Sequence, residues 1–121
     1  MGYTNAAKDA AVNAIRALLT SNIGYVSMHT ADPGTTGTSE ATGTAYARGS
    51  STFPAASGGT GSTGSQASVT ARTGSTTAAT HWGLWTASSG GTFITGGALT
   101  TTENFSTAGG TLLFTPTLSA S

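Results

Sequence analysis

The chain has 121 residues, which predicts a single domain spanning residues 1–121. Four Lys and Arg residues balance four Asp and Glu residues, so there is no basic stripe to neutralise phosphates, and this argues against nucleic acid as a partner. Thr, Ala, Gly and Ser supply 26, 20, 18 and 15 residues, whereas the large apolar types supply only 24. So thin a core predicts that contacts with other subunits add to the stability of the chain.

Two further classes are disfavoured by composition. The chain has no cysteine, so it has neither a disulfide framework nor a cysteine-based metal site. Lys8, Asp9 and Arg16 interrupt the first apolar pattern, and the apolar runs elsewhere are short. We therefore expect neither a signal peptide nor a membrane span.

The first predicted element is an amphipathic helix over residues 4–21. Thr4 is a suitable N-cap, and Asn22 and Gly24 are typical of a helix C-terminus. The expected apolar stripe consists of Ala7, Ala11, Ala14, Ile15, Leu18 and Leu19, and the opposite side carries Asn5, Asp9, Asn13, Arg16 and Thr20. The stripe is expected to cover a sheet or to meet the same helix of another subunit.

After Gly24 the hydrophobic period changes to two, which predicts short strands. The Asp32-Pro33-Gly34 turn ends the first of them. A glycine-rich loop is expected over 54–64, and the SSGG turn at 88–91 gives the strongest hairpin signal. Pro116 lacks a donor and indicates a sheet edge. The predicted strands are 25–31, 44–53, 66–72, 80–87, 92–99 and 111–119.

Together these elements predict a mainly β protein: a small antiparallel β-sandwich over about residues 25–119, preceded by one N-terminal amphipathic α-helix.

The two histidines, His29 and His81, both fall within predicted strands. Two histidines with no convincing third ligand make a poor zinc site, so each is interpreted as a hydrogen-bonded residue of a sheet face or a subunit contact. Paired glycines recur along the chain, but none is followed by Lys-Ser/Thr and a helix, so they indicate turns rather than a phosphate-binding loop. We expect no metal and no cofactor.

Asp32 and Glu40 are the only acidic residues close together in sequence, and paired carboxylates of this kind serve glycosidases. Asp32 precedes Pro-Gly, however, where an aspartate usually accepts a backbone hydrogen bond within its own turn. No serine lies in a G-x-S-x-G elbow with an acid and a histidine around it. The sequence therefore favours a protein without catalytic residues.

Trp82 and Trp85 are three positions apart in one predicted strand, so they are expected on opposite faces of it. With Phe93 they are expected to form an aromatic cluster, in which one tryptophan lies in the core and the other faces the solvent or a partner. The second tryptophan is interpreted either as a platform on which a sugar stacks or as a buried anchor between subunits. The anchor is favoured, because a domain with so small a core needs additional burial.

Two blocks carry a resemblance: YVSMHTADPGTTGTSEATGTAYAR at 25–48 and THWGLWTASSGGTFITGGALT at 80–100. They are similar to a family of small tailed-bacteriophage virion proteins, usually labelled tail fibre or minor tail protein. Those proteins have an opening helix, a "SLHTADPGTTG"-like strand and turn, a "YAR" strand and a "THFGLW…GGTFLGGGAL" hairpin. The similarity spans about residues 4–118, with Met28 in place of the commoner leucine, Trp82 in place of phenylalanine and a more glycine-rich loop at 54–64.

The resemblance implies a structural role, and it provides no catalytic residues to carry over. We expect a non-enzymatic virion protein on the particle exterior, self-associating or bound to a symmetric lattice. Capsid decoration and binding of a host glycan or receptor are the alternatives. Its expected partners are copies of itself, other virion proteins and, in the last case, a host surface glycan. The candidate subunit-contact residues are Leu18, Asp32, Arg48, Trp82 and Trp85.

Overall fold

The computed structural model describes residues 2–42, 46–70, 78–103 and 110–120. Within them the chain is mainly β, as predicted, with antiparallel strand pairs and one N-terminal α-helix. The elements in chain order are α1 (Asn5–Arg16), a 3-10 turn (Thr20–Asn22), β1 (Ile23–His29), β2 (Gly49–Thr52), β3 (Ser62–Thr63), β4 (Ala67–Thr70), β5 (Ala79–Trp85), β6 (Phe93–Glu103), β7 (Thr111–Phe114) and β8 (Thr117–Leu118).

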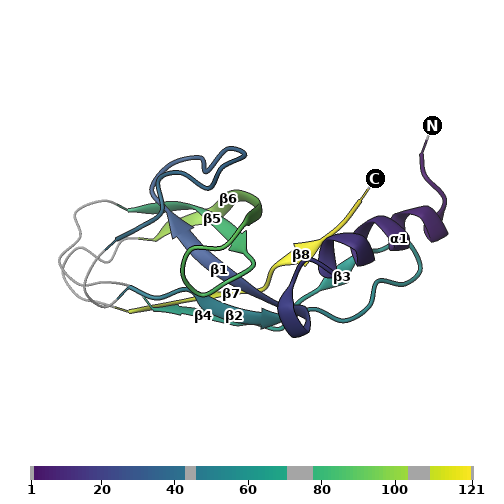
Figure 1. The fold of residues 1–121 in the computed structure, drawn as a ribbon. Coiled ribbons are helices and arrows are strands. Elements are labelled where there is room, and N and C mark those ends of the chain that lie inside the picture. Colours follow the sequence, from purple (N-terminus) through teal and green to yellow (C-terminus); the bar gives the residue numbers. More distant parts are fainter. Residues whose placement is uncertain (1, 43–45, 71–77, 104–109, 121) are drawn as a thin grey trace.

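The strands form a sandwich-like body, and α1, β3 and β8 form an arm at one end of it (Figure 1). One layer is a four-stranded sheet in the order β2-β1-β5-β6, and the other is a two-stranded ribbon in which β4 pairs with β7. The same two chain segments continue as β3 paired with β8, beside which α1 lies. The helix therefore packs beyond the end of the four-stranded sheet and not across its face.

The apolar core lies between the two layers. Val26 and Leu84 are directly opposite in the β1–β5 ladder, both are fully buried, and they belong to one cluster with Val69 and Leu112 of the ribbon. Alternation with a period of two places these residues on the same side of their strands. The remaining face of β1 and β5 is therefore turned away from the ribbon.

The predicted hairpin is confirmed, since β5 and β6 pair antiparallel around the turn 86–92. The last predicted strand is divided into β7 and β8 at Pro116, whose carbonyl accepts a hydrogen bond from Gly64 (2.8 Å). Strand β3 lies within the segment 54–64 that we expected to be a loop. Residues 44–45 and 71–72 of the predicted strands are outside the described residues.

The predicted helix was too long: α1 ends at Arg16, not at residue 21. Its N-terminus is as predicted, with the Thr4 hydroxyl accepting a hydrogen bond from Ala7 N (3.2 Å). After Arg16 the bonds tighten to an i→i+3 pattern, from Leu18 N to Ile15 O and from Leu19 N to Arg16 O. Left-handed backbone at Ser21 and Asn22 then turns the chain into β1.

In the single chain the helix does not cover a sheet with its apolar stripe, and whether the stripe meets the same helix of another subunit stays a prediction. The polar stripe faces protein: Asp9 Oδ1 accepts from Gly59 N (2.9 Å), Asn13 Oδ1 accepts from Ala56 N (2.9 Å), and Arg16 Nε donates to Phe53 O (2.7 Å). The segment 53–60 lies outside the strands, so these side chains satisfy backbone groups that no sheet satisfies. Much of the predicted apolar stripe is exposed instead, namely Ala7, Ala11, Ala14 and Leu18, while Val12 and Leu19 are buried.

Candidate functional site

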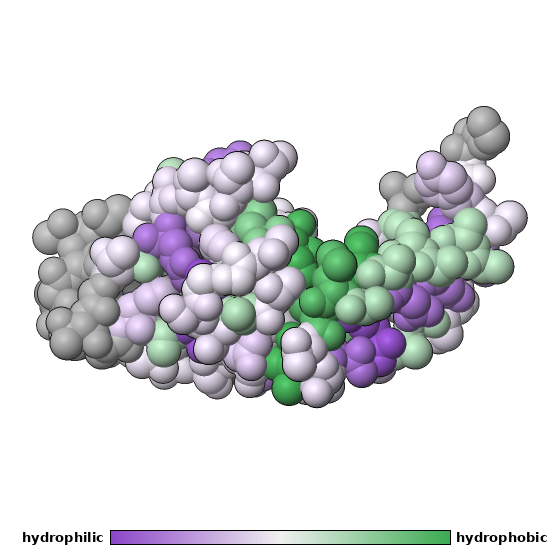
Figure 2. Space-filling view, viewed as in Figure 1, coloured by the Kyte–Doolittle hydropathy of each residue, from purple (hydrophilic) through white to green (hydrophobic). Residues whose placement is uncertain are grey.

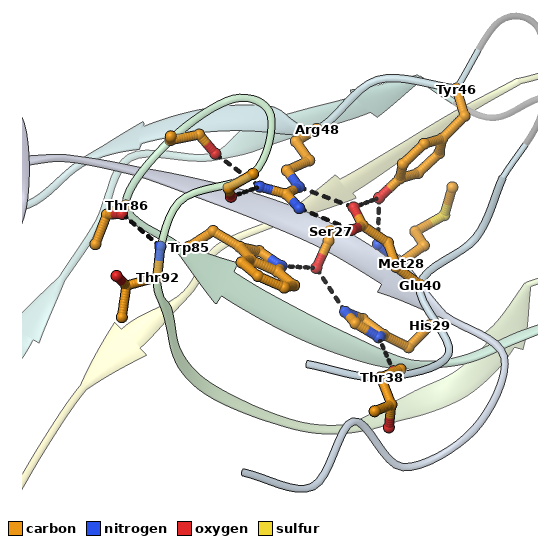
Figure 3. Close-up of polar contacts among 12 residues, drawn as sticks. Ser27, Met28, His29, Thr38, Glu40, Tyr46, Arg48, Trp85, Thr86 and Thr92 are labelled. Atoms are coloured by element: carbon orange, nitrogen blue, oxygen red, sulfur yellow. Dashed lines mark hydrogen bonds and ion pairs between the residues drawn. The ribbon is translucent and has the colours of Figure 1, made fainter. Parts of the chain in front are cut away.

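Polar and aromatic side chains collect on the face of β1 and β5 that is turned away from the ribbon. Ser27 and His29 come from β1, and Trp85 comes from β5. The loop 30–42 returns over this face, with Thr30 N donating to Ser39 O (2.9 Å) and Ala41 N donating to Met28 O (2.8 Å) at its base. We call Ser27, His29, Glu40, Tyr46, Arg48 and Trp85 the polar cluster (Figure 3).

A directed chain of hydrogen bonds runs through the cluster. His29 Nδ1 lies 2.7 Å from the Thr38 carbonyl oxygen, which can only accept, so Nδ1 carries the hydrogen. In a neutral imidazole Nε2 is then the acceptor, and the Ser27 hydroxyl at 2.7 Å must donate to it. Trp85 Nε1 donates in turn to Ser27 Oγ (2.9 Å). The order of the chain is indole, hydroxyl, imidazole and loop carbonyl.

The imidazole of His29 is held neutral. His29 is fully buried, and this burial lowers its pKa below the ordinary value of 6.5. The hydrogen bond to Thr38 and the charge of Glu40 act in the opposite direction without reversing that effect.

Arg48 joins three separate segments. Its Nε and Nη2 donate to the two carboxylate oxygens of Glu40, both at 2.8 Å, in a bidentate pair. Its Nη1 donates to the carbonyls of Ala87 (2.8 Å) and Gly90 (2.9 Å) in the β5–β6 turn. The guanidinium also lies 4.0 Å from the centre of the Trp85 ring. Only 7 % of the Arg48 side chain is exposed, so these donors are used inside the chain.

Tyr46 completes the environment of Glu40. Its hydroxyl donates to Glu40 Oε2 (2.7 Å) and accepts from Met28 N (3.1 Å). Burial alone would raise the pKa of Glu40, but the hydrogen bonds from Arg48 and Tyr46 outweigh it and hold that pKa below its ordinary value. Burial, followed by the bond to the carboxylate, raises the pKa of Tyr46. Glu40 is therefore a structural anion.

The loop 30–42 is shaped by its own turns. Asp32 Oδ1 accepts from Gly34 N (2.8 Å), as predicted for an aspartate before Pro-Gly. Gly37 has a φ of +76°, and a Cβ at that position would lie 2.5 Å from the Trp85 ring. Gly37 thus has two reasons to lack a side chain: its left-handed backbone and its contact with the ring. The carboxylate of Asp32 remains at the exposed tip of the loop.

The two tryptophans lie on opposite faces of β5, as predicted. Trp82 packs on Phe114 of the ribbon, with 4.9 Å between ring centres, and borders the apolar core. Trp85 makes an edge contact with Phe93 at 5.2 Å within the polar cluster. The predicted aromatic cluster is therefore divided, because Phe93 follows Trp85 and not Trp82. Both tryptophans are half-buried, and whether either contacts another subunit stays a prediction.

The cluster contains groups capable of chemistry, but they are enclosed. Ser27 and His29 have the separation of a nucleophile and its base, yet neither has any exposed surface. Asp32 and Glu40 do not converge as paired carboxylates, since Asp32 bonds within its turn and Glu40 bonds to Arg48 and Tyr46. His29 and His81 are opposite each other in the β1–β5 ladder. Among the described residues, no three His, Cys, Asp or Glu residues gather in a way that could hold a metal ion.

Sequence reasoning missed Ser27 and Tyr46. Ser27 alternates with His29 in a predicted strand, so period two was a usable signal that the two share a face. Tyr46 had no such signal, because its role depends on a hydrogen bond to Glu40, six positions away in the sequence. No helix among residues 2–42, 46–70, 78–103 and 110–120 is long and apolar enough to cross a membrane.

A β body, an enclosed polar cluster and a loop held by hydrogen bonds are features of a structural module. Residues 3–118 match the model of the family described as "Podophage GP4 fiber I protein gp80". The chain therefore belongs to this family of phage fibre proteins, and the resemblance noted in its sequence is confirmed. Membership associates the chain with the virion. No curated protein matches it.

Proposed function

We propose that this chain is a non-enzymatic subunit of a fibre on the exterior of a phage particle, where it associates with copies of itself or with a symmetric lattice of other virion proteins. Among the described residues, the observation that carries the proposal is an apolar surface beside the arm. Figure 2 shows it in the hollow between the body and α1. Ile15, Trp82, Ile94 and Leu118 line a hollow of about 270 Å³ there.

Large apolar side chains outside this hollow are also exposed. Leu18 on the arm is 61 % exposed and Leu113 on β7 is 56 % exposed. The chain has no net charge, so two copies can meet without long-range repulsion. Of the candidate contact residues, Leu18 suits this role best, because its side chain has no competing contact in the core. The fibre location is preferred to capsid decoration because the matched family is described as a fibre protein.

The test of self-association is the Leu18→Asp variant, measured by sedimentation velocity across micromolar concentrations. The wild type is expected to associate and the variant to stay monomeric. Because Leu18 is exposed in the single chain, the variant should keep its β-type circular dichroism spectrum. Thr35→Asp, at the exposed tip of the loop 30–42, is the matched control and should associate like the wild type. A monomeric wild type at every concentration, or unchanged association of Leu18→Asp, would contradict the assignment.

The absence of catalysis has its own test. Ser27 is enclosed, so a fluorophosphonate probe should label it no faster than it labels the Ser27→Ala variant. The purified chain should also release no sugar from host envelope material. Labelling confined to Ser27, or sugar release lost in Glu40→Gln, would show an enzyme.

Glycan binding is the second candidate, and one feature favours it. An open hollow of about 460 Å³ lies beside the polar cluster, with Thr42, Ser88, Ser89, Glu40 and Arg48 among its lining residues. Hydroxyl and charged groups around a concave surface are suited to a polar ligand such as a sugar. Titration of host surface glycans into ¹⁵N-labelled protein tests this candidate, which requires shifts at Ser88 and Ser89.

A further inference from the structure

The hydrogen-bond chain through His29 is complete only while the imidazole is neutral. Thr38 O requires the hydrogen on Nδ1, and the Ser27 hydroxyl requires a free lone pair on Nε2. The chain also fastens the loop 30–42, since Thr38 belongs to the loop whereas Ser27, His29 and Trp85 belong to the sheet.

A proton on Nε2 would break this arrangement. The imidazolium becomes a donor at both nitrogens, so Ser27 Oγ would receive hydrogens from both His29 and Trp85 while its own hydrogen lost its acceptor. Ser27 is fully buried, and a Cβ at Gly83 would lie 2.6 Å from its Oγ. The β5 side of Ser27 therefore has no space for a water molecule that could accept the hydrogen of the hydroxyl. Both the orphaned hydroxyl and the buried charge are costly.

The charged and titratable groups around His29 come from every neighbouring segment. Glu40 in the loop favours the imidazolium, whereas Arg48, beside β2, and His81, on β5, oppose it. The charge of Glu40 is already paired with Arg48 at 2.8 Å. Tyr46 donates to the same carboxylate and remains neutral, because its pKa is raised. Phe93 of β6 supplies only an uncharged ring edge, with its centre 6.3 Å from that of the imidazole.

We propose that His29 is a pH-dependent latch: protonation at Nε2 releases the loop 30–42 from the β1–β5 face and admits water to Ser27 and Trp85. The loop can move as a unit, because Gly37 N and Thr38 N bond within it to Pro33 O. It is held in place by the backbone bond from Ala41 N to Met28 O, the His29 bond to Thr38, the Glu40 bonds to Arg48 and Tyr46, and the packing of Gly37 on the Trp85 ring and of the buried Pro33 against Gly96. Among these contacts, the His29 bond is the one that depends on a histidine, the side chain whose ordinary pKa lies closest to neutrality.

The linkage between proton binding and loop opening predicts how much, and in which direction, the population of the open loop changes with pH. An imidazole in the open loop titrates near its ordinary value of 6.5, and the enclosed imidazole titrates lower. Below about pH 6.5 the open state therefore binds more protons, and its population relative to the closed state rises by up to about tenfold per pH unit. The rise ends at the pKa of the closed state.

The experiment uses the two indole N–H protons of the full chain, observed by NMR from about pH 7.5 to about pH 5, the range in which histidine titrates. Trp85 Nε1 is hydrogen-bonded to the buried Ser27, while Trp82 is on the opposite face of β5 and serves as an internal reference. After correction for intrinsic exchange rates, the protection of the Trp85 indole should fall by up to about tenfold per pH unit below about pH 6.5. Protection of the Trp82 indole should stay constant.

Two variants test whether His29 causes the pH-dependent loss of Trp85 indole protection. His29→Gln keeps a donor and an acceptor but cannot titrate, so Trp85 protection should no longer depend on pH. His81→Gln removes the other imidazole and should keep the response, with a midpoint that moves at most slightly upward because His81 opposes the imidazolium. If His29→Gln does not fold, the His29 ring resonances of His81→Gln decide, since their midpoint must coincide with the loss of Trp85 protection. Constant protection in the wild type, an unaltered response in His29→Gln or a separate midpoint would each overturn the latch.

Discussion

The two faces of the β1–β5 strand pair are both buried, one by apolar packing and the other by hydrogen-bonded polar side chains. On one face Val26 and Leu84 meet the ribbon in an apolar core that needs no specific partners. On the other face Ser27 and His29 are equally well buried, but each polar atom has a defined partner. Among the described residues that are not exposed, no buried side-chain nitrogen or oxygen lacks a hydrogen bond.

The difference shows how a chain with few large apolar residues can bury both sides of a sheet. A loop of mostly small residues cannot cover a face by hydrophobic contact alone, so Arg48 and His29 fasten it by hydrogen bonds. Such a network rigidifies a structure when it is fully satisfied, and it becomes costly when one member is lost. The apolar face therefore depends on close packing, whereas the polar face depends on every hydrogen-bond partner.

The largest expected effect comes from the apolar face. Leu84→Ala should lower the free energy of unfolding by about 4 kcal/mol, towards the upper end for a fully buried leucine, since the two layers cannot close over the cavity. Urea unfolding followed by circular dichroism measures it. A loss no greater than that of an exposed-site control, Leu113→Ala, would mean that the layers are not packed as described.

Arg48→Met tests the polar face. It leaves the Glu40 carboxylate with Tyr46 alone and frees two turn carbonyls, at Ala87 and Gly90. We expect a loss of about 3 kcal/mol, the lower end for orphaning one member of a buried ion pair, because 21 % of the Glu40 side chain is exposed. Urea unfolding of the single variants and of the double variant with Glu40→Gln separates the pair from its surroundings. Additive losses would show that the two residues are not coupled.

The ion pair also predicts a dependence of stability on pH. The pKa of Glu40 is lowered on folding, so its contribution is complete above its ordinary value of 4.5 and is lost as the pH falls from there through the folded value. The gap in stability between the wild type and Glu40→Gln should therefore narrow below about pH 4.5. Thermal unfolding of both proteins across this range gives the result. A constant gap would mean that Glu40 is not perturbed in the folded chain.

The sequence predicted the face assignments better than the elements that lie over them. Period two placed Trp82 and Trp85 on opposite sides, and the SSGG turn located the β5–β6 hairpin, because both are local properties of the chain. The length of the helix was predicted wrongly, and its alanines match the apolar period of a helix but bury little surface. Asp9, Asn13 and Arg16 instead bind the backbone of a segment more than 35 positions away.

The candidate site shows the same limit. Asp32 could be assigned to its turn because its partner is two residues away. The partners of Arg48 include the carbonyls of Ala87 and Gly90, which only the closed fold brings near, so these contacts could not be predicted. Whether Arg48 also contacts a neighbouring subunit stays a prediction. Long-range backbone acceptors leave no pattern in a sequence.

The smallest expected effect separates the tip of the loop from the cluster beneath it. Asp32→Ala removes one exposed hydrogen bond, from Gly34 N, and should lower the free energy of unfolding by about 1 kcal/mol or less. The fastenings of the loop through Thr38 and Glu40 lie elsewhere, so protection of the Trp85 indole should be unchanged at neutral pH. Asp32→Asn, which keeps an acceptor oxygen, should recover most of the loss. Urea unfolding and indole exchange measure the two quantities on the same samples. If Asp32→Ala instead exposed Trp85, the turn would be a fastening of the polar face, and the contrast between a self-contained tip and a partner-dependent cluster would fail.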